Sequence, residues 1–339
     1  MVDRSAARRA FVVASGWGDA RESLLAGDAS FRTYYRLTRG DRSVVVMDAP
    51  PPQEDVRPFV RLARHLLSLG LSAPEILAVD EQAGFLLEED LGDSTYARWF
   101  NDPRWGDRRD DREEWAMYTL ATDVLVHLAA QGAAAVLPGL ASYSGEALID
   151  AAMLLPEWYL PQVAARPATA AELESYRAAW RESLRALPSS PSTLVLRDYH
   201  QDNLLWLRER PGVRACGLLD FQDATTGHPA YDLMSLVEDA RRDIAEDLRT
   251  AMIQHYLDRA GVADRQDFMA AFAILGAQRH ARVVGLFIRL LRRDGKPTYL
   301  PHLPRVWRLL ERSLRHEAMA PLRRWVDAHI PPGQRGIPA

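Results

Sequence analysis

Apolar and polar residues first follow a pattern that is typical of a β-hairpin. Aromatic and β-forming residues fill positions 30–37, a polar turn with Gly40 follows, and a β-branched run covers 43–47. Two runs of this kind that are separated by a short turn pair as antiparallel strands. The pattern therefore predicts a hairpin in the first part of the chain.

Helical spacing replaces this pattern after the three prolines at 50–52. Apolar residues recur over 53–69 at the intervals of an amphipathic helix. Two further short strands are predicted at 75–79 and 85–88, on either side of a turn. The apolar run at 10–15 is too short for a secretion signal and predicts an N-terminal amphipathic helix.

Long helical patterns dominate after residue 93, and short strand patterns interrupt them. The helical candidates are 113–131, 145–160, 171–187 and most of 229–330, and the strand candidates are 193–196, 204–207 and 214–219. We predict an α+β protein with a small antiparallel-sheet N-lobe, residues 1–91, and a larger, mostly helical C-lobe, residues 92–339. The tail after about residue 330 contains proline and glycine and is expected to fray.

Composition excludes several classes of function. With 47% hydrophobic and 26% charged residues, the 339-residue chain has the balance of an ordinary soluble globular protein. Its net charge is -4 and its arginines are interleaved with acids, so we expect no nucleic-acid partner and no membrane partner. We also expect a cytoplasmic protein without an obligate protein partner. Cys216, the one cysteine, lies in an apolar run and is predicted to be buried.

Three polar residues follow short predicted strands at a spacing that suggests phosphoryl transfer. Asn203 comes five positions after Asp198, and Asp220 ends the next strand. Any one of them could simply cap a turn. Together they supply a carboxylate for the attacking hydroxyl, and an amide and a second carboxylate for Mg²⁺. The spacing matches the catalytic loop and the metal-binding strand end of kinases.

Segments 194–206 and 227–233 resemble motifs of the aminoglycoside phosphotransferase and choline kinase superfamily. The resemblance implies a protein-kinase-like bilobal fold with ATP as the phosphate donor and Mg²⁺ as the cofactor. It also implies that Asp198 is the catalytic base and that Asn203 and Asp220 are magnesium ligands. Asp232 is implied to be a buried brace rather than a ligand.

Two N-terminal segments resemble nucleotide-binding parts of the same superfamily. Segment 85–92 resembles the hinge, which implies cofactor contacts from Glu88, Glu89 and Leu91, although a plain strand and turn would have the same pattern. Segment 27–36 lies at the place of the phosphate-covering loop, which implies contacts from Ser30, Phe31 and Arg32.

One feature departs from the superfamily pattern. Most of its kinases carry a lysine on the third strand that contacts the α- and β-phosphates. Here the only lysine of the chain is Lys296, far from this lobe. Either Arg32 or Arg36 supplies the phosphate contact, or Mg²⁺ and the backbone hold the nucleotide. An inactive nucleotide-binding regulatory protein is a further alternative.

Several short segments narrow the resemblance to one branch of the superfamily, the kinases that phosphorylate C1 of N-acetylmuramate and N-acetylglucosamine in peptidoglycan recycling. These segments are 47–51, 89–92, 197–204, 219–224, 227–229 and 299–301. The resemblance implies an amino sugar as the substrate. Aminoglycoside, choline- and homoserine-type kinases are the alternatives.

Acceptor contacts are predicted from four residues. A sugar is bound by an aromatic surface and directional polar groups, which Trp158 and Glu157 supply in a helical region. Arg279 supplies a cation for the lactyl carboxylate of N-acetylmuramate, and His200 lies in the catalytic loop. Each of these side chains could instead have a structural role in the core or on a solvated face.

Overall fold

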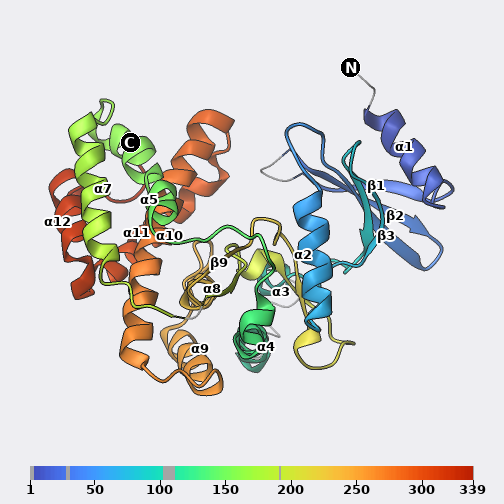
Figure 1. The fold of residues 1–339 in the computed structure, drawn as a ribbon. Helices are drawn as coiled ribbons and strands as arrows, with labels where there is room; N and C mark the ends of the chain where they lie inside the picture. The colour runs from blue at the N-terminus through green and yellow to red at the C-terminus, as the bar shows by residue number, and fades with distance from the viewer. Residues whose placement is uncertain (1–3, 28–30, 102–110, 191, 339) are drawn as a thin grey trace. The chain divides into compact units, whose positions relative to one another are not determined.

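The computed structural model describes residues 4–27, 31–101, 111–190 and 192–338 (Figure 1). The chain forms two compact units, and each unit combines two parts of the sequence. The first lies within residues 1–124 and 201–224, and the second lies within 125–200 and 225–339. The predicted lobe boundary after residue 91 thus falls inside the first unit.

A five-stranded antiparallel sheet forms the first unit, with strand order β1-β2-β3-β5-β4. Its strands are β1 (Arg21–Gly27), β2 (Thr33–Arg39), β3 (Arg42–Asp48), β4 (Ile76–Asp80) and β5 (Phe85–Glu89). The helices of this part are α1 (Arg4–Ala14), α2 (Arg57–Ser68), α3 (Tyr96–Asn101) and α4 (Asp111–Gln131), the last of which continues into the second unit. The predicted hairpin is confirmed as β2 and β3, and Gly40 adopts the positive φ of 62° that its turn requires.

The two faces of the sheet have different roles because side chains alternate along a strand. On β3, Val44 and Val46 pack in one cluster with Val12 of α1. The intervening Val45 lines a cavity together with Phe59 of α2. One face is therefore closed by a helix, and the other contributes to a binding site.

A second hairpin, β7 (Leu204–Trp206) and β8 (Cys216–Leu218), completes the first unit. It is joined to the rest of the unit by bridges from Ser72 to Gly217 and from Thr95 to Leu205. The sequence-based prediction of this hairpin and of a buried Cys216 is confirmed. The hairpin positions the residues that precede β7 and follow β8 beside the sheet.

The second unit is mostly helical, as predicted. Its helices are α5 (Glu146–Ala152), α6 (Leu160–Ala164), α7 (Ala170–Leu184), α8 (Ala230–Val237), α9 (Glu246–Arg259), α10 (Arg265–Asp294), α11 (Leu303–Leu314) and α12 (Ala320–His329). Strands β6 (Thr193–Val195) and β9 (Thr225–Gly227) pair in an antiparallel manner. The long helix α10 packs against α5, α8 and α11. No described helix has the length and apolarity needed to cross a membrane.

The predicted helix over 145–160 is interrupted in the structure. After α5 the chain forms a π-helical turn at Leu155–Tyr159 and continues as α6. This turn packs so closely on α10 that a Cβ on Gly285 would lie 2.1 Å from the backbone of Leu154. Only glycine permits this approach, and the sequence pattern alone does not reveal it.

The predicted fraying of the C-terminal tail is wrong. The hydroxyl of Tyr159 donates to the carbonyl oxygens of Gln334 and Gly336, at 2.7 and 3.0 Å. The Arg335 guanidinium donates to Glu311 at 2.8 Å. The side chains of Tyr159 and Arg335 thus bind the C-terminal segment to the helices, although the composition of this segment suggested disorder.

Candidate active site

A cavity of about 300 Å³ lies in the first unit and is lined by three of the six predicted nucleotide contacts. Apolar side chains that include Val45, Phe59 and Leu205 form part of its wall, as suits a planar ring. Further lining comes from the predicted hinge and metal residues, namely Glu88, Glu89, Leu91, Asn203 and Asp220. The structure therefore brings these five predicted residues to one site.

Ion pairs fix the hinge segment to the sheet. Arg36 on β2 donates to both carboxylate oxygens of Asp90, at 2.7 and 2.9 Å, and to Asp93 at 2.9 and 3.0 Å. Its hydrogen bonds to Asp93 and Asp90 raise the pKa of Arg36. Arg210 also donates to Glu89. Of the two arginines considered for the phosphate contact, Arg36 is thus engaged in holding the hinge.

Arg32 occupies a different environment, next to the predicted metal site. Its side chain is 9% exposed and its guanidinium lies 3.6 Å from Asp220 and 3.7 Å from Glu54. The backbone N–H of Phe31 donates to the other oxygen of Glu54 at 3.0 Å. Phe31 itself is exposed, and the predicted contact Ser30 lies outside the described residues.

Glu54 is a residue that sequence reasoning missed. Kinases pair the phosphate-binding lysine with a glutamate in a helix, and the predicted helix over 53–69 offers no glutamate in its middle. In the structure α2 begins at Arg57, and Glu54 precedes it in an irregular segment. The sequence does contain a glutamate just before this helix. Its pairing with Arg32, however, depends on the fold and has no signature in the sequence.

The buried Glu88 gives the cavity an unusual carboxyl group. Its side chain is almost fully covered, and among the described residues one of its oxygens lacks a hydrogen-bond partner. Burial raises its pKa to about 8, against the opposing effect of Arg32. At neutral pH this group is therefore mostly protonated and can donate a hydrogen bond.

The predicted metal ligands lie on two adjoining loops. The Asn203 amide nitrogen is 3.4 Å from one oxygen of Asp220, and Gln222 donates to the other oxygen at 2.8 Å. The backbone N–H of Leu219 donates to the carbonyl of Asn203 at 2.9 Å and ties the loops together. Asp220 has a positive φ of 55°, a strained conformation that recurs at functional sites.

These two side chains fit Mg²⁺, which prefers oxygen ligands and is commonly held by one or two carboxylates together with substrate phosphates. Asn203 and Asp220 lie close enough to share one ion. The described part of the chain contains no group of three or more His, Cys, Asp and Glu residues suited to a metal. Two protein ligands leave coordination positions for waters and phosphate oxygens, which are common ligands of Mg²⁺.

Asp198 lies in the second unit, on a loop that a buried carboxylate holds in place. Asp232 accepts hydrogen bonds from the backbone N–H groups of Leu196, at 2.6 Å, and Arg197, at 2.9 Å. Burial raises the pKa of Asp232 to about 7 despite these bonds. Arg197 has a positive φ of 69°, so the loop turns sharply before Asp198. Asp232 is therefore a brace, as the resemblance implies.

Cations surround the carboxylate of Asp198. Arg279 is buried, donates to the carbonyl of Arg197 at 2.9 Å and lies 3.4 Å from Asp198. Burial alone would raise the pKa of Asp198, but the guanidinium groups of Arg279, Arg282 and Arg197 outweigh burial and lower it. Asp198 is thus ionised at neutral pH and is oriented by a fixed guanidinium.

The comparisons with known proteins agree with this geometry. A model of the phosphotransferase enzyme family matches residues 22–272, which include all the residues described so far around Asp198 and Asp220 except Arg279 and Arg282. The chain belongs to this phosphotransferase family. Its predicted assignment to that family is confirmed, and a nucleotide donor is implied.

The similarity of this phosphotransferase to known kinases extends over nearly the whole chain. An N-acetylmuramate/N-acetylglucosamine kinase of Caulobacter vibrioides is 37% identical, with 97% of each protein covered. A kinase of the same name from Pseudomonas aeruginosa is 38% identical over 89% of this chain and 87% of the relative. A choline/ethanolamine kinase family protein of Mesorhizobium loti matches in structure with a TM-score of 0.60 and 17% identity, over 95% of this chain and 99% of that one. The predicted α+β kinase-like fold is confirmed.

The remaining predicted acceptor residues of the phosphotransferase have different environments. His200 is buried, its Nε2 lies 3.3 Å from Arg241, and burial lowers its pKa well below the usual value. Glu157 is exposed on the π-helical turn. Trp158 packs against the helical core of the second unit. Arg279 and His200 thus lie close to Asp198, and the turn that carries Glu157 and Trp158 packs on α10, the helix of Arg279. Sugar contacts from these four residues stay predictions.

Proposed function

We propose that this chain is an ATP- and Mg²⁺-dependent kinase that phosphorylates the anomeric C1 hydroxyl of N-acetylmuramate or N-acetylglucosamine in peptidoglycan recycling. The observation that carries the proposal is the 37% identity over 97% of the chain to a kinase named for these two sugars. The nucleotide cavity and the ionised Asp198 support the same chemistry.

Asp198 would act on the acceptor hydroxyl. A carboxylate held below its ordinary pKa is a weak base, which suits proton acceptance late in a loose transition state. The anomeric hydroxyl of a sugar is more acidic than an ordinary alcohol, so a weak base is sufficient for it. Arg279 would position Asp198, since its guanidinium contacts both that carboxylate and the preceding carbonyl.

Asn203 and Asp220 would hold the Mg²⁺ ion, which neutralises phosphate charge when it is bound. Arg32 would take the part of the absent lysine, because its guanidinium lies beside Asp220 and is fixed by Glu54. Glu88, Glu89 and Leu91 would contact the rest of the nucleotide from the cavity wall. Each of these residues would bind the nucleotide or its metal ion, and none would take part in proton transfer.

The position of transfer on the sugar provides the test of the proposed function. The wild-type protein is incubated with ATP, Mg²⁺ and each sugar, and the product is examined by mass spectrometry and by a reducing-end assay. We expect a monophosphate that no longer reduces copper, because phosphorylation at C1 locks the ring. The 1-O-methyl glycosides should not be phosphorylated. Turnover of a methyl glycoside, or a product that still reduces copper, would assign the acceptor to another hydroxyl.

Replacement of the phosphate-binding arginine gives a further prediction. Arg32→Gln is expected to raise the KM for ATP roughly tenfold to a hundredfold, since a charge-assisted contact to phosphate is lost. Glu54→Gln should also raise the KM for ATP, but by a smaller factor, because it removes only the carboxylate that orients Arg32. Initial rates at varied ATP and saturating sugar measure both effects.

Arg39→Gln is the matched control for Arg32, because Arg39 lies on the neighbouring strand β2 and pairs with Asp19 at 3.0 Å. It should leave the KM for ATP unchanged within about threefold. If Arg32→Gln kept the wild-type KM for ATP, a different group would have to replace the missing lysine.

A further inference from the structure

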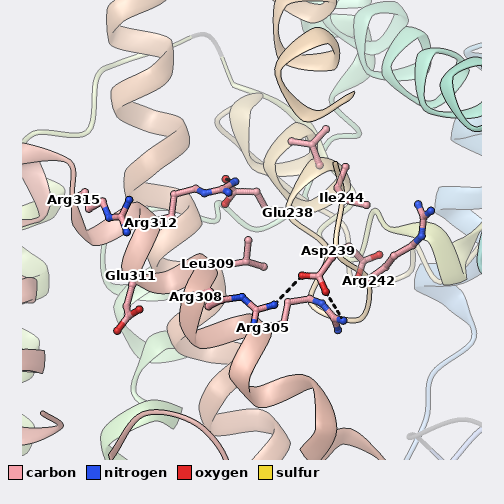
Figure 2. A pocket seen from close by; sticks show the side chains of 12 residues that line it. Glu238, Asp239, Arg242, Ile244, Arg305, Arg308, Leu309, Glu311, Arg312 and Arg315 are labelled. Carbon is pink, nitrogen blue, oxygen red and sulfur yellow. Dashed lines mark hydrogen bonds and ion pairs between the residues drawn. The ribbon is translucent and has the colours of Figure 1, made fainter. Parts of the chain in front are cut away.

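The second unit contains a cavity of about 370 Å³ that has not entered the proposed mechanism. Figure 2 shows its polar lining, with Arg305, Arg308, Arg312 and Arg315 on one side and Glu238, Asp239 and Arg242 on another. Arg305, Arg308 and Arg312 lie on α11, and Glu238 and Asp239 follow the end of α8. The lining has five arginines and four acidic residues, and this excess of positive charge favours a ligand with a negative charge.

Two of these arginines already form a carboxylate-binding pair. Arg305 and Arg308 are three positions apart on α11 and therefore project from the same side of the helix. Both donate to Asp243, at 2.9 and 3.0 Å, and the hydrogen bond from Arg305 is the main cause that lowers the pKa of that carboxyl. Asp243 itself is 64% exposed. The pair thus binds a carboxylate at the surface of the cavity, where a ligand can compete for it.

A series of side-chain interactions leads from the wall of this cavity to the catalytic loop within the second unit. Asp239 in its wall accepts from the backbone N–H of Arg241 at 2.7 Å, and the Arg241 side chain lies 3.3 Å from His200. Asp239 also contributes to raising the pKa of Arg279, the residue that contacts Asp198. The cavity wall and the surroundings of Asp198 therefore share side chains.

We infer that this cavity receives the lactyl side arm of N-acetylmuramate, with its carboxylate bound by Arg305 and Arg308. This inference rests on the proposed function. N-acetylglucosamine lacks the lactyl group, so the pair contributes to only one of the two sugars. The sequence-based prediction assigned this role to Arg279, whose guanidinium is instead directed to Arg197 and Asp198.

The test compares the two sugars with the same variant, so N-acetylglucosamine serves as the control for N-acetylmuramate. Arg305→Gln is expected to lower kcat/KM for N-acetylmuramate roughly 10- to 100-fold, the usual effect of losing one charge-assisted pair. It should change kcat/KM for N-acetylglucosamine by less than about threefold. Arg308→Gln should act in the same direction, and it is the second variant if Arg305→Gln does not fold. Arg324→Gln, on the surface of α12 at 3.9 Å from Glu182, is the control.

A modified substrate distinguishes the effect of the lactyl charge from the effect of the lactyl shape. The methyl ester of N-acetylmuramate keeps the lactyl arm but not its charge, so the wild-type protein should use it less well than the acid. The Arg305→Gln variant should no longer distinguish the ester from the acid. Asp243→Asn removes the competing carboxylate and should lower the KM for N-acetylmuramate, with no change for N-acetylglucosamine.

Two results would overturn the inference. An equal loss for both sugars in Arg305→Gln and Arg308→Gln would mean that the pair serves the fold or the sugar ring. An unchanged kcat/KM for N-acetylmuramate in both variants would place the lactyl carboxylate elsewhere. In both cases turnover of the sugars by the wild-type protein would leave the proposed function intact. If the wild-type protein phosphorylated neither sugar, the proposed function and this inference would both fall.

Discussion

Asp198→Asn is expected to lower kcat roughly 10²- to 10⁴-fold, the range for loss of a general base. The amide keeps the size of the side chain but cannot accept the proton of the acceptor hydroxyl. Nucleotide affinity should change little, because Asp198 does not line the nucleotide cavity and is proposed to act on the acceptor hydroxyl. Single-turnover rates and binding titrations with ATP and Mg²⁺ separate the two effects.

The pH dependence of the wild-type enzyme provides an independent check on the same residue. Arg279 and its neighbours keep the pKa of Asp198 below its ordinary value, so the carboxylate stays ionised as the pH falls through that ordinary value. We therefore expect no loss of kcat in that range from protonation of Asp198. If Asp198→Asn kept more than a few per cent of the wild-type kcat, Asp198 would not be the base.

The sequence was sufficient for those parts of the site that depend on local order. Asp198 and Asn203 belong to one loop, and Asp220 directly follows a short apolar strand, so their spacing and the family resemblance were enough to predict them together. The hairpins were predictable for the same reason, since alternation and turn residues are local signals. Strand β1 was not predicted, because its residues are mostly exposed and Leu24 is 67% exposed, which removes the usual alternation.

Pairings between distant segments could not be derived in this way. Glu54 and Arg32 are separated by a strand hairpin, and the arginine pair of α11 meets Asp243 from a segment more than sixty positions away. Arginines in a helix usually form a solvated face. What distinguishes Arg305 and Arg308 is a carboxylate and a cavity contributed by another part of the chain, which has no local signature.

Asp220→Ala is expected to abolish most of the Mg²⁺ dependence of nucleotide binding. With Mg²⁺ present, the affinity for ATP should fall roughly 10- to 100-fold, because one carboxylate of a site that has few protein ligands is removed. Without Mg²⁺, the variant should bind ATP as tightly as the wild type or more tightly. The reason is that a negative charge beside Arg32 no longer opposes the phosphates. Calorimetric titrations with and without Mg²⁺ measure both affinities.

A loss of ATP affinity with Mg²⁺ but not without it distinguishes a metal ligand from a structural residue. A variant that merely damaged the fold would bind ATP more weakly under both conditions and would have a lower Tm. Asp41→Ala is the matched control, since Asp41 is exposed in the turn between β2 and β3 and the substitution changes the charge by the same amount. It should leave both affinities at the wild-type level. If the ratio of the affinities with and without Mg²⁺ were the same in Asp220→Ala as in the wild type, Asp220 would not hold the ion, and Asn203 would have to do so with groups outside this pair.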